Sequence, residues 1–301
     1  MRRYFLMDMR RLFRTRGFYI AIIVSIFFLS IFALASYYVT GIAEEFVPGS
    51  ERMLNPQLIS QARAQMTFNF FFSFFFSLPG MRMLHMLLSL FAAGYLSKEH
   101  QSGYLKNMLS LPGMRGKWMV SKTLIMLLAT LIFYAVFGLA CVLVLLFYGN
   151  PVVIKLPELA PFLLGQVTVD MALYAVIMLV VMLFQSKAAA VVVALILSLN
   201  MQALLYLLID WVGILPIKLT SYGMMNLAAK AQMPGSMSSL MSGAGMGRMT
   251  DVIGGSADPG LLLAVAGGVL IIFLLLSALS LRKADYKGYT PRKIISARSF
   301  T

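Results

Sequence analysis

Charge is scarce in this chain. Charged residues make up 12% of its 301 residues and hydrophobic residues 60%, whereas an ordinary soluble domain has about 25% charged and 45–50% apolar residues. The apolar residues gather in uncharged stretches of about twenty, the length that crosses roughly 30 Å of hydrocarbon. The composition therefore predicts an all-α integral membrane protein rather than a soluble domain.

Cysteine and histidine are also rare. Cys141 is the single cysteine, and His85 and His100 are the two histidines. One cysteine excludes an intrachain disulfide and a cysteine-rich metal site. Two histidines that are far apart in sequence give no zinc or haem constellation, so we expect no metal site.

Three enzyme motifs are missing. The sequence has no G-x-x-x-x-G-K-[ST] phosphate loop, no G-x-S-x-G nucleophile turn and no H-E-x-x-H metalloprotease helix. We therefore expect that this chain is not an enzyme, has no catalytic residues and carries no cofactor of its own.

The apolar stretches predict six transmembrane helices in a single domain that covers residues 1–301. The first stretch lacks a small-residue cleavage site and is long enough to span, which favours a retained helix over a removed signal peptide. Because residues 66–97 are too long for one straight crossing, we expect a break near Pro79 and Gly80, with the Phe-rich part 66–78 in the outer leaflet or re-entrant. The spans are predicted at about 17–39, 70–97, 121–148, 160–184, 188–209 and 259–281, with outer segments at 40–69 and 210–258.

Basic residues set the expected orientation. The N-terminus, the 98–122 loop, the Gln185–Lys187 turn and the C-terminal tail together hold 18 of the 25 Lys and Arg residues. By the positive-inside rule these segments face the cytoplasm, so we expect a multi-pass protein of the cytoplasmic membrane with both termini inside. The net charge of +14 fits an anionic membrane face better than nucleic acid, because the basic residues lie beside apolar spans.

The first sixteen residues interleave six arginines with apolar side chains. On a helix this gives one cationic and one apolar face, which is typical of an amphipathic helix lying in the membrane interface. The alternative is a plain basic flank that only fixes orientation.

Several polar side chains fall within the predicted spans. An ionised group at the centre of a bilayer costs roughly 2.5–3.5 kcal/mol on insertion scales, so such residues are expected to face protein or water. Asp170 could line a substrate path or pair with Arg82, which could instead reach outward to the interface. The alternative for all of them is a structural hydrogen bond between helices. The candidate intramembrane path consists of Arg82, His85, Gln166, Asp170, Asn200 and Gln202.

The segment between the second and third spans is amphipathic. Apolar residues recur at helical spacings from Tyr104 to Leu111, and Pro112 with Gly113 ends the pattern. A short helix held between two spans could dock in a groove on a soluble partner and act as a lever. The alternative is an ordinary basic loop that sets topology.

This segment resembles the first cytoplasmic loop of ABC-2 type transporter permeases. In that family an acidic residue after the second span precedes a Gly-Thr pair, a short helix, a Pro or Gly break and a Ser-Lys pair, although Tyr104 stands here where Thr is usual. The basic N-terminus and the residues 281–286 resemble the beginning and end of the family's membrane domain. The matching loop residues are Glu99, Gly103, Lys106, Asn107, Leu109, Ser110, Pro112, Arg115, Ser121 and Lys122.

The resemblance implies a permease subunit of an ABC exporter. A separate cytoplasmic ABC ATPase would bind ATP and Mg, and a second permease copy or homologue would complete a dimer in the lipid bilayer. The Phe-rich and Met-rich stretches suggest an amphipathic or hydrophobic cargo, such as an antimicrobial peptide or a lipid-like molecule. Other interpretations are a sensor or immunity subunit without transport and an ion-coupled transporter that uses Asp170. The expected coupling contacts are Glu99, Gly103, Tyr104, Leu105, Asn107, Met108 and Leu109.

Overall fold

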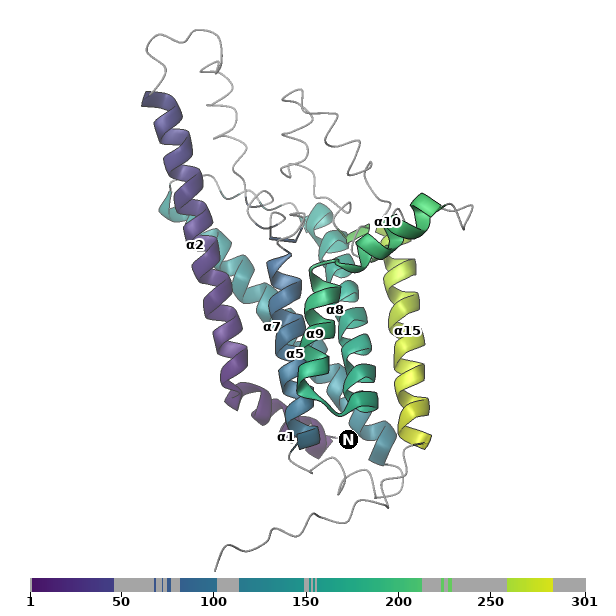
Figure 1. Cartoon of the computed structure of the whole chain (residues 1–301). Coiled ribbons are helices and arrows are strands. Elements are labelled where there is room, and N and C mark those ends of the chain that lie inside the picture. Colours follow the sequence, from purple (N-terminus) through teal and green to yellow (C-terminus); the bar gives the residue numbers. More distant parts are fainter. Residues whose placement is uncertain are drawn as a thin grey trace, which may run out of the picture.

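The computed structural model shows a bundle of α-helices (Figure 1). It describes residues 2–45, 68, 72, 75, 76, 82–101, 114–148, 152, 154, 156–212, 223, 224, 227, 228 and 259–283, and within these residues it contains no β-strand. The helices are α1 (Arg2–Arg14), α2 (Arg16–Glu45), α5 (Met83–Gln101), α7 (Met114–Phe147), α8 (Leu156–Phe184), α9 (Lys187–Ser198), α10 (Gln202–Val212) and α15 (Pro259–Lys283).

Four helices are long and apolar enough to cross a membrane, and they confirm the prediction of a helical membrane protein. Their candidate spans are Arg16–Ala35, Met114–Phe147, Leu159–Phe184 and Gly260–Leu281. The pair α9 and α10 gives a fifth span if its two helices count as one. α5 does not pass the same test on its own, since its last turn carries Lys98, Glu99 and His100. The count of six spans stays a prediction.

The helices run back and forth along the bundle. In Figure 1, α1, the end of α5, the start of α7, the turn between α8 and α9 and the end of α15 all lie at the lower end. A hydrogen bond from Arg115 Nη1 to the Leu281 carbonyl oxygen, 2.7 Å long, joins the start of α7 to the end of α15. The basic segments that the sequence assigns to one side of the membrane therefore border a common end of the bundle.

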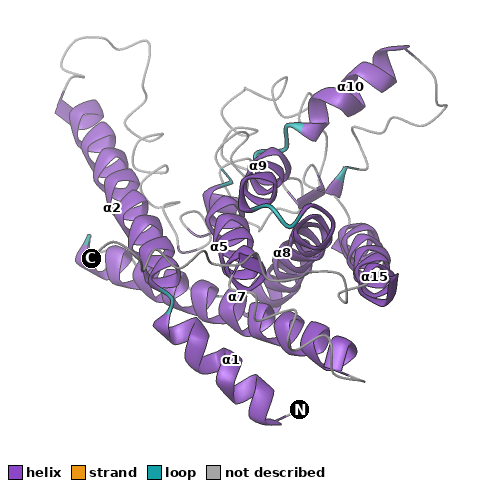
Figure 2. Cartoon of the chain, turned by 60° about the horizontal axis from the view of Figure 1, so that its bottom comes forward, coloured by secondary structure: helices purple, strands orange, loops and turns teal. Residues whose placement is uncertain are grey.

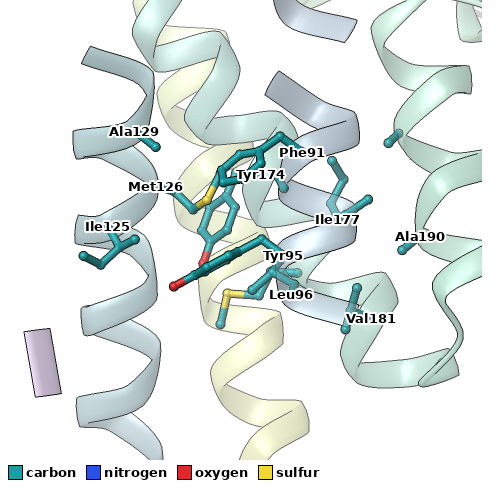
Figure 3. Packing of buried hydrophobic residues seen from close by; sticks show 14 of the residues in the cluster. Phe91, Tyr95, Leu96, Ile125, Met126, Ala129, Tyr174, Ile177, Val181 and Ala190 are labelled. Carbon is teal, nitrogen blue, oxygen red and sulfur yellow. The ribbon is translucent and has the colours of Figure 1, made fainter. Parts of the chain in front are cut away.

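α5 and α8 form the centre of the bundle. α5 packs against α2, α8 and α9, and α8 also packs extensively against α15. Figure 3 shows Tyr95 of α5, Met126 of α7 and Tyr174 of α8 gathered in one buried cluster, with Ala190 of α9 at its edge. By contrast, α2 exposes large apolar side chains such as Ile23 and Phe27. The polar groups of His85, Gln166 and Asp170 on α5 and α8 are therefore enclosed by protein, while α2 has the surface expected of a helix in contact with lipid.

Four phenylalanines from the Phe-rich stretch belong to the core. Phe68, Phe72, Phe75 and Phe76 are buried in helical positions, and their spacing of four, three and one places them on one helix face. They pack against α2, α7 and α8, with Phe76 in edge-on contact with Tyr134 and Phe162. The expected break at Pro79 and Gly80 lies outside the described residues.

Three predicted boundaries differ from the structure. The 98–122 connection is shorter than expected, because α5 continues to Gln101 and α7 begins at Met114. The predicted fourth span, 160–184, begins too late, because α8 starts at Leu156 and holds Pro157 in its first turn, where proline needs no hydrogen-bond partner for its nitrogen. The predicted fifth span, 188–209, is divided into α9 and α10 with a bend of 58°.

Asn200 explains the division of the fifth span. It has a positive φ of 58°, a backbone conformation that asparagine tolerates better than most residues. The Asn200 nitrogen donates to the Leu197 carbonyl (3.1 Å) and the Met201 nitrogen donates to the Ile196 carbonyl (2.9 Å). These two bonds form a Schellman motif, which satisfies carbonyls at a helix end.

The contact between α8 and α15 gives a test of the packing. A Cβ atom added at Gly165 would lie 2.9 Å from Leu262 Cδ2, and Leu262 is buried. We expect Gly165→Ala to lower the free energy of unfolding by about 1–3 kcal/mol, since the buried Leu262 side chain has to leave its position or α15 has to shift. The control is Gly94→Ala, whose Cβ meets nothing within 4 Å and which should raise stability by up to about 1 kcal/mol. Unfolding in mixed micelles measures both, and equal effects would contradict the packing.

Candidate functional site

A buried ionic cluster joins α1, α5 and α7. Lys122 of α7 has its Nζ 2.7 Å from Asp8 Oδ1 of α1 and 2.5 Å from Glu99 Oε1 of α5. Ser121 Oγ donates to Asp8 Oδ2 (2.7 Å) and Trp118 Nε1 donates to Glu99 Oε2 (3.2 Å). Each carboxylate is therefore held through both of its oxygens.

Charges balance within this cluster. The Lys122 side chain is fully buried, and its Nζ also lies 4.9 Å from the centre of the Tyr95 ring, close enough for a cation–π contact. Arg11 Nη1 approaches Glu99 Oε1 at 3.4 Å, but its side chain is 38% exposed, so solvent screens that pair. Two carboxylates thus face one buried and one half-exposed cation.

The position of Asp8 along α1 explains why its side chain reaches this cluster. Asp8 is the acidic residue among the six arginines at the N-terminus, and it lies one helical turn before Leu12, which is fully buried. Asp8 and Leu12 therefore share the face of α1 that packs on α7, a contact that Figure 2 shows from below. Arg10 and Arg14 are exposed. The lone acid in a basic segment is the signal that could have identified Asp8.

Glu99 is the described member of the predicted coupling contacts. It is buried and bound by Lys122 and Trp118 near the end of α5. The other predicted contacts, Gly103, Tyr104, Leu105, Asn107, Met108 and Leu109, lie outside the described residues. Coupling through any of them stays a prediction.

A second buried polar cluster lies between α5, α7 and α8. His85 Nδ1 is 2.6 Å from Asp170 Oδ1, and His85 Nε2 is 3.0 Å from Gln166 Oε1. The Tyr134 hydroxyl donates to Asp170 Oδ2, and Gln166 Nε2 donates to the Ala228 carbonyl oxygen at 3.1 Å. The ring of Phe76 lies edge-on to His85.

The structure brings three of the six predicted path residues together, namely His85, Gln166 and Asp170. The suggested pairing of Asp170 with Arg82 is wrong, because the Asp170 oxygens bind His85 and Tyr134 instead. Arg82 is buried just before α5, and its Nε and Nη1 have no hydrogen-bond partner among the described residues. The sequence did not single out Tyr134, which sits in an apolar run without any polar neighbour to mark it.

Asn200 and Gln202 lie elsewhere, at the break between α9 and α10. Gln202 Nε2 donates to the Leu197 carbonyl oxygen at 3.5 Å, and Asn200 occupies the left-handed position of the Schellman motif. Both residues thus help to end α9. A role for either in a transport path stays a prediction.

A small cavity adjoins the second cluster. Its volume is about 10 Å³ and its lining includes Asp170, Ser89, Thr130 and Tyr174. This is close to the least volume that holds one water molecule. Among the described residues, no group of three or more His, Cys, Asp or Glu side chains could hold a metal ion.

Comparison with protein families matches residues 7–201 to the family described as ABC-2 family transporter protein. The matched range contains both buried clusters apart from Ala228, and it covers more than half of the chain. Comparison with curated proteins gives no match.

Proposed function

The chain belongs to the ABC-2 family of transporter proteins, and from that premise we propose that it is the membrane-spanning permease subunit of an ATP-driven exporter. A separate cytoplasmic ATPase subunit supplies the energy, and two permease subunits work as a pair. The cargo is amphipathic or hydrophobic and leaves across the cytoplasmic membrane. The observation that carries the proposal is the ionic cluster of Asp8, Glu99 and Lys122, in which Glu99 and Lys122 flank the 102–113 connection in the sequence.

This cluster supports a mechanical role for the connection. Glu99 precedes the connection on α5 and Lys122 follows it on α7, and their side chains meet at 2.5 Å. Asp8 adds α1 to the same cation. A partner that pushes on the connection therefore acts on three helices that are bound to one another, which suits the rigid-body motions that switch transporters between states.

The surface of α1 supports its placement in the membrane interface. Arg10 and Arg14 are exposed beside the exposed apolar side chains of Leu6 and Phe13. Cations next to apolar groups suit a helix lying among anionic headgroups. With α1 at the cytoplasmic interface, the basic ends of α7 and α15 face the same side, and both termini are inside.

Co-purification and coupled hydrolysis test the proposal. After extraction in mild detergent, a soluble ATPase subunit with a phosphate loop should co-purify with the chain. In reconstituted vesicles, the double variant Leu105→Ser and Leu109→Ser should lose cargo-stimulated ATP hydrolysis at least about tenfold, because docking requires apolar contact. Val120→Ser serves as the control, since Val120 is an exposed apolar residue of α7 outside the connection.

Two outcomes would contradict the proposal. The first is a purified complex that contains no ATPase, and the second is unchanged hydrolysis in the double variant when it is inserted normally. Transport that persists without ATP and collapses in Asp170→Asn would favour the ion-coupled alternative. Binding of a ligand without any transport would favour a sensor or immunity subunit.

A further inference from the structure

The orientation of Gln166 fixes the hydrogen atoms of the second buried cluster. Gln166 Nε2 lies 3.1 Å from the Ala228 carbonyl oxygen, and a carbonyl oxygen can only accept. The amide nitrogen of Gln166 must therefore point at Ala228, which leaves its Oε1 facing His85 Nε2 at 3.0 Å. An amide oxygen is also an acceptor only, so His85 Nε2 has to carry a hydrogen.

The other side of the imidazole ring leads to the same requirement. His85 Nδ1 lies 2.6 Å from Asp170 Oδ1, while the Tyr134 hydroxyl donates to Asp170 Oδ2. The short contact between Nδ1 and Oδ1 needs a hydrogen between them, carried either by Nδ1 or by Oδ1. Together with the hydrogen on Nε2, this gives the pair one proton more than a neutral imidazole beside a carboxylate: it is either an imidazolium beside a carboxylate or a neutral imidazole beside a carboxylic acid.

We infer that His85 and Asp170 form a buried proton-binding site in which the two side chains share one proton and Gln166 senses whether that proton is bound. His85 is fully buried and Asp170 is nearly so, and the shared proton leaves the pair without net charge inside the bundle. This inference concerns the chain by itself and is independent of the partner ATPase and of the cargo.

Loss of the proton has a structural consequence at Ala228. Without a hydrogen on Nε2, the imidazole lone pair faces Gln166 Oε1, and two acceptors repel each other. Rotating the amide by 180° relieves that contact but turns Oε1 toward the Ala228 carbonyl oxygen, which is again a pair of acceptors. Deprotonation therefore breaks one of the two hydrogen bonds whichever way the amide points.

The segment that Gln166 holds is part of the core. Leu227 and Ala228 are buried against Val169 and Leu173 of α8 and against Leu262 and Ala266 of α15. The hydrogen bond from Gln166 is the described polar link from the proton-binding site to this segment. Protonation of His85 thus tightens the contact of residues 227 and 228 with α8, and deprotonation loosens it.

Few other ionisable groups face this site. α7 contributes Tyr134 and α8 contributes Asp170, while Arg82 is the nearest cation along α5, one turn before His85. Within the described parts of α9 and α15, charged side chains occur only at Lys187, Arg282 and Lys283, at the helix ends. The adjoining cavity, lined by Ser89, Thr130 and Tyr174 beside Asp170, is the polar space closest to the pair.

Nitrogen NMR of the full chain in lipid nanodiscs tests the proton directly. The chain is labelled with ¹⁵N in its histidine rings, and His100→Gln leaves His85 as the sole histidine. We expect Nε2 to show a directly bonded hydrogen at pH 7, and Nδ1 to carry a hydrogen as well or to accept one from Asp170. An Nε2 without a bonded hydrogen at pH 7 would overturn the inference.

Hydrogen exchange tests the link to Ala228. Gln166→Met keeps the side-chain volume close but removes both hydrogen-bonding groups of the amide, so the ratio of molecules with a hydrogen on His85 Nε2 to molecules without one should fall by about tenfold, as expected for a lost hydrogen bond. Amide exchange of residues 223–228 should become faster in this variant. Thr168→Val is the control, because the Thr168 hydroxyl bonds only within α8. Unchanged exchange in a folded Gln166→Met protein would reject the sensing role.

The two measurements remain informative if a variant does not fold. The NMR experiment keeps every residue of the cluster and so decides whether the proton is present. If Gln166→Met fails to fold, Gln166→Glu retains an acceptor for His85 but has no amide hydrogen for Ala228. It should keep the hydrogen on His85 Nε2 and still accelerate exchange of residues 223–228, and slow exchange in it would reject the sensing role.

Discussion

Replacing Lys122 with methionine is expected to lower the free energy of unfolding by about 3–5 kcal/mol, the cost of removing one partner from a buried ion pair. Lys122 is fully buried and lies within 2.7 Å of carboxylate oxygens from both Asp8 and Glu99. Methionine fills similar space but leaves two negative charges inside the protein. Reversible unfolding in mixed micelles measures the loss.

Two further variants separate the charge effect from packing. Lys117→Met removes a cation from the same helix, but Lys117 is exposed, so the change should stay within about 0.5 kcal/mol. Adding Asp8→Asn and Glu99→Gln to Lys122→Met removes all three charges together and should recover most of the stability. If the triple variant is as unstable as Lys122→Met, the unpaired carboxylates are not the cause.

The second large effect is expected for His85→Leu. This change leaves the Asp170 carboxylate buried with the Tyr134 hydroxyl as its described partner, and it frees Gln166 Oε1 from its contact with the ring. We expect a loss of about 3–5 kcal/mol, because an uncompensated charge remains in the bundle. The same micelle unfolding measurement applies, with insertion confirmed by membrane fractionation.

A double-mutant cycle shows whether His85 and Asp170 act as a pair. Asp170→Asn in the His85→Leu background removes the uncompensated charge and should restore part of the lost stability. The two substitutions should therefore be non-additive, with an interaction energy of about 0.5–3 kcal/mol. Simple additivity would indicate that the two side chains do not interact in the folded protein.

Much of the architecture follows from the spacing of apolar and basic residues. The predicted fourth and sixth spans lie inside α8 and α15, and the third, 121–148, lies inside α7 except for its last residue, since uncharged stretches of that length have to be helical in a membrane. The tight turn at Gln185–Lys187 is also confirmed, with Ser186 as the N-cap of α9. These features depend on local sequence alone.

Contacts between side chains that are far apart in the sequence cannot be predicted from local spacing. His85 and Asp170 are 85 residues apart, and their contact depends on how α5 and α8 are rotated and shifted against each other. The same holds for Asp8 and Lys122, which are 114 residues apart. The sequence indicated that Asp170 needs a polar environment, but the choice between Arg82 and His85 as its partner is a matter of helix register.

The break at Asn200 was missed for a different reason. The stretch 188–209 contains no glycine or proline, the residues that usually mark an interruption. Asparagine at the left-handed position of a helix end was the available signal, and it was interpreted as a polar group in a continuous span. The apolar side chains on both sides of the break hid the change of direction.

The short length of α9 affects the surrounding lipid. Its twelve residues rise about 18 Å, whereas the 29 residues of α8 rise about 44 Å. α10 then turns sideways across the upper end of the bundle (Figure 1) and exposes Leu204, Leu208 and Trp211. A bilayer of ordinary thickness, roughly 30 Å of hydrocarbon, is therefore not matched by an upright helix at this position. We therefore expect acyl chains beside α9 to end against α10, so that the leaflet on the α10 side is locally thinner there than around α8.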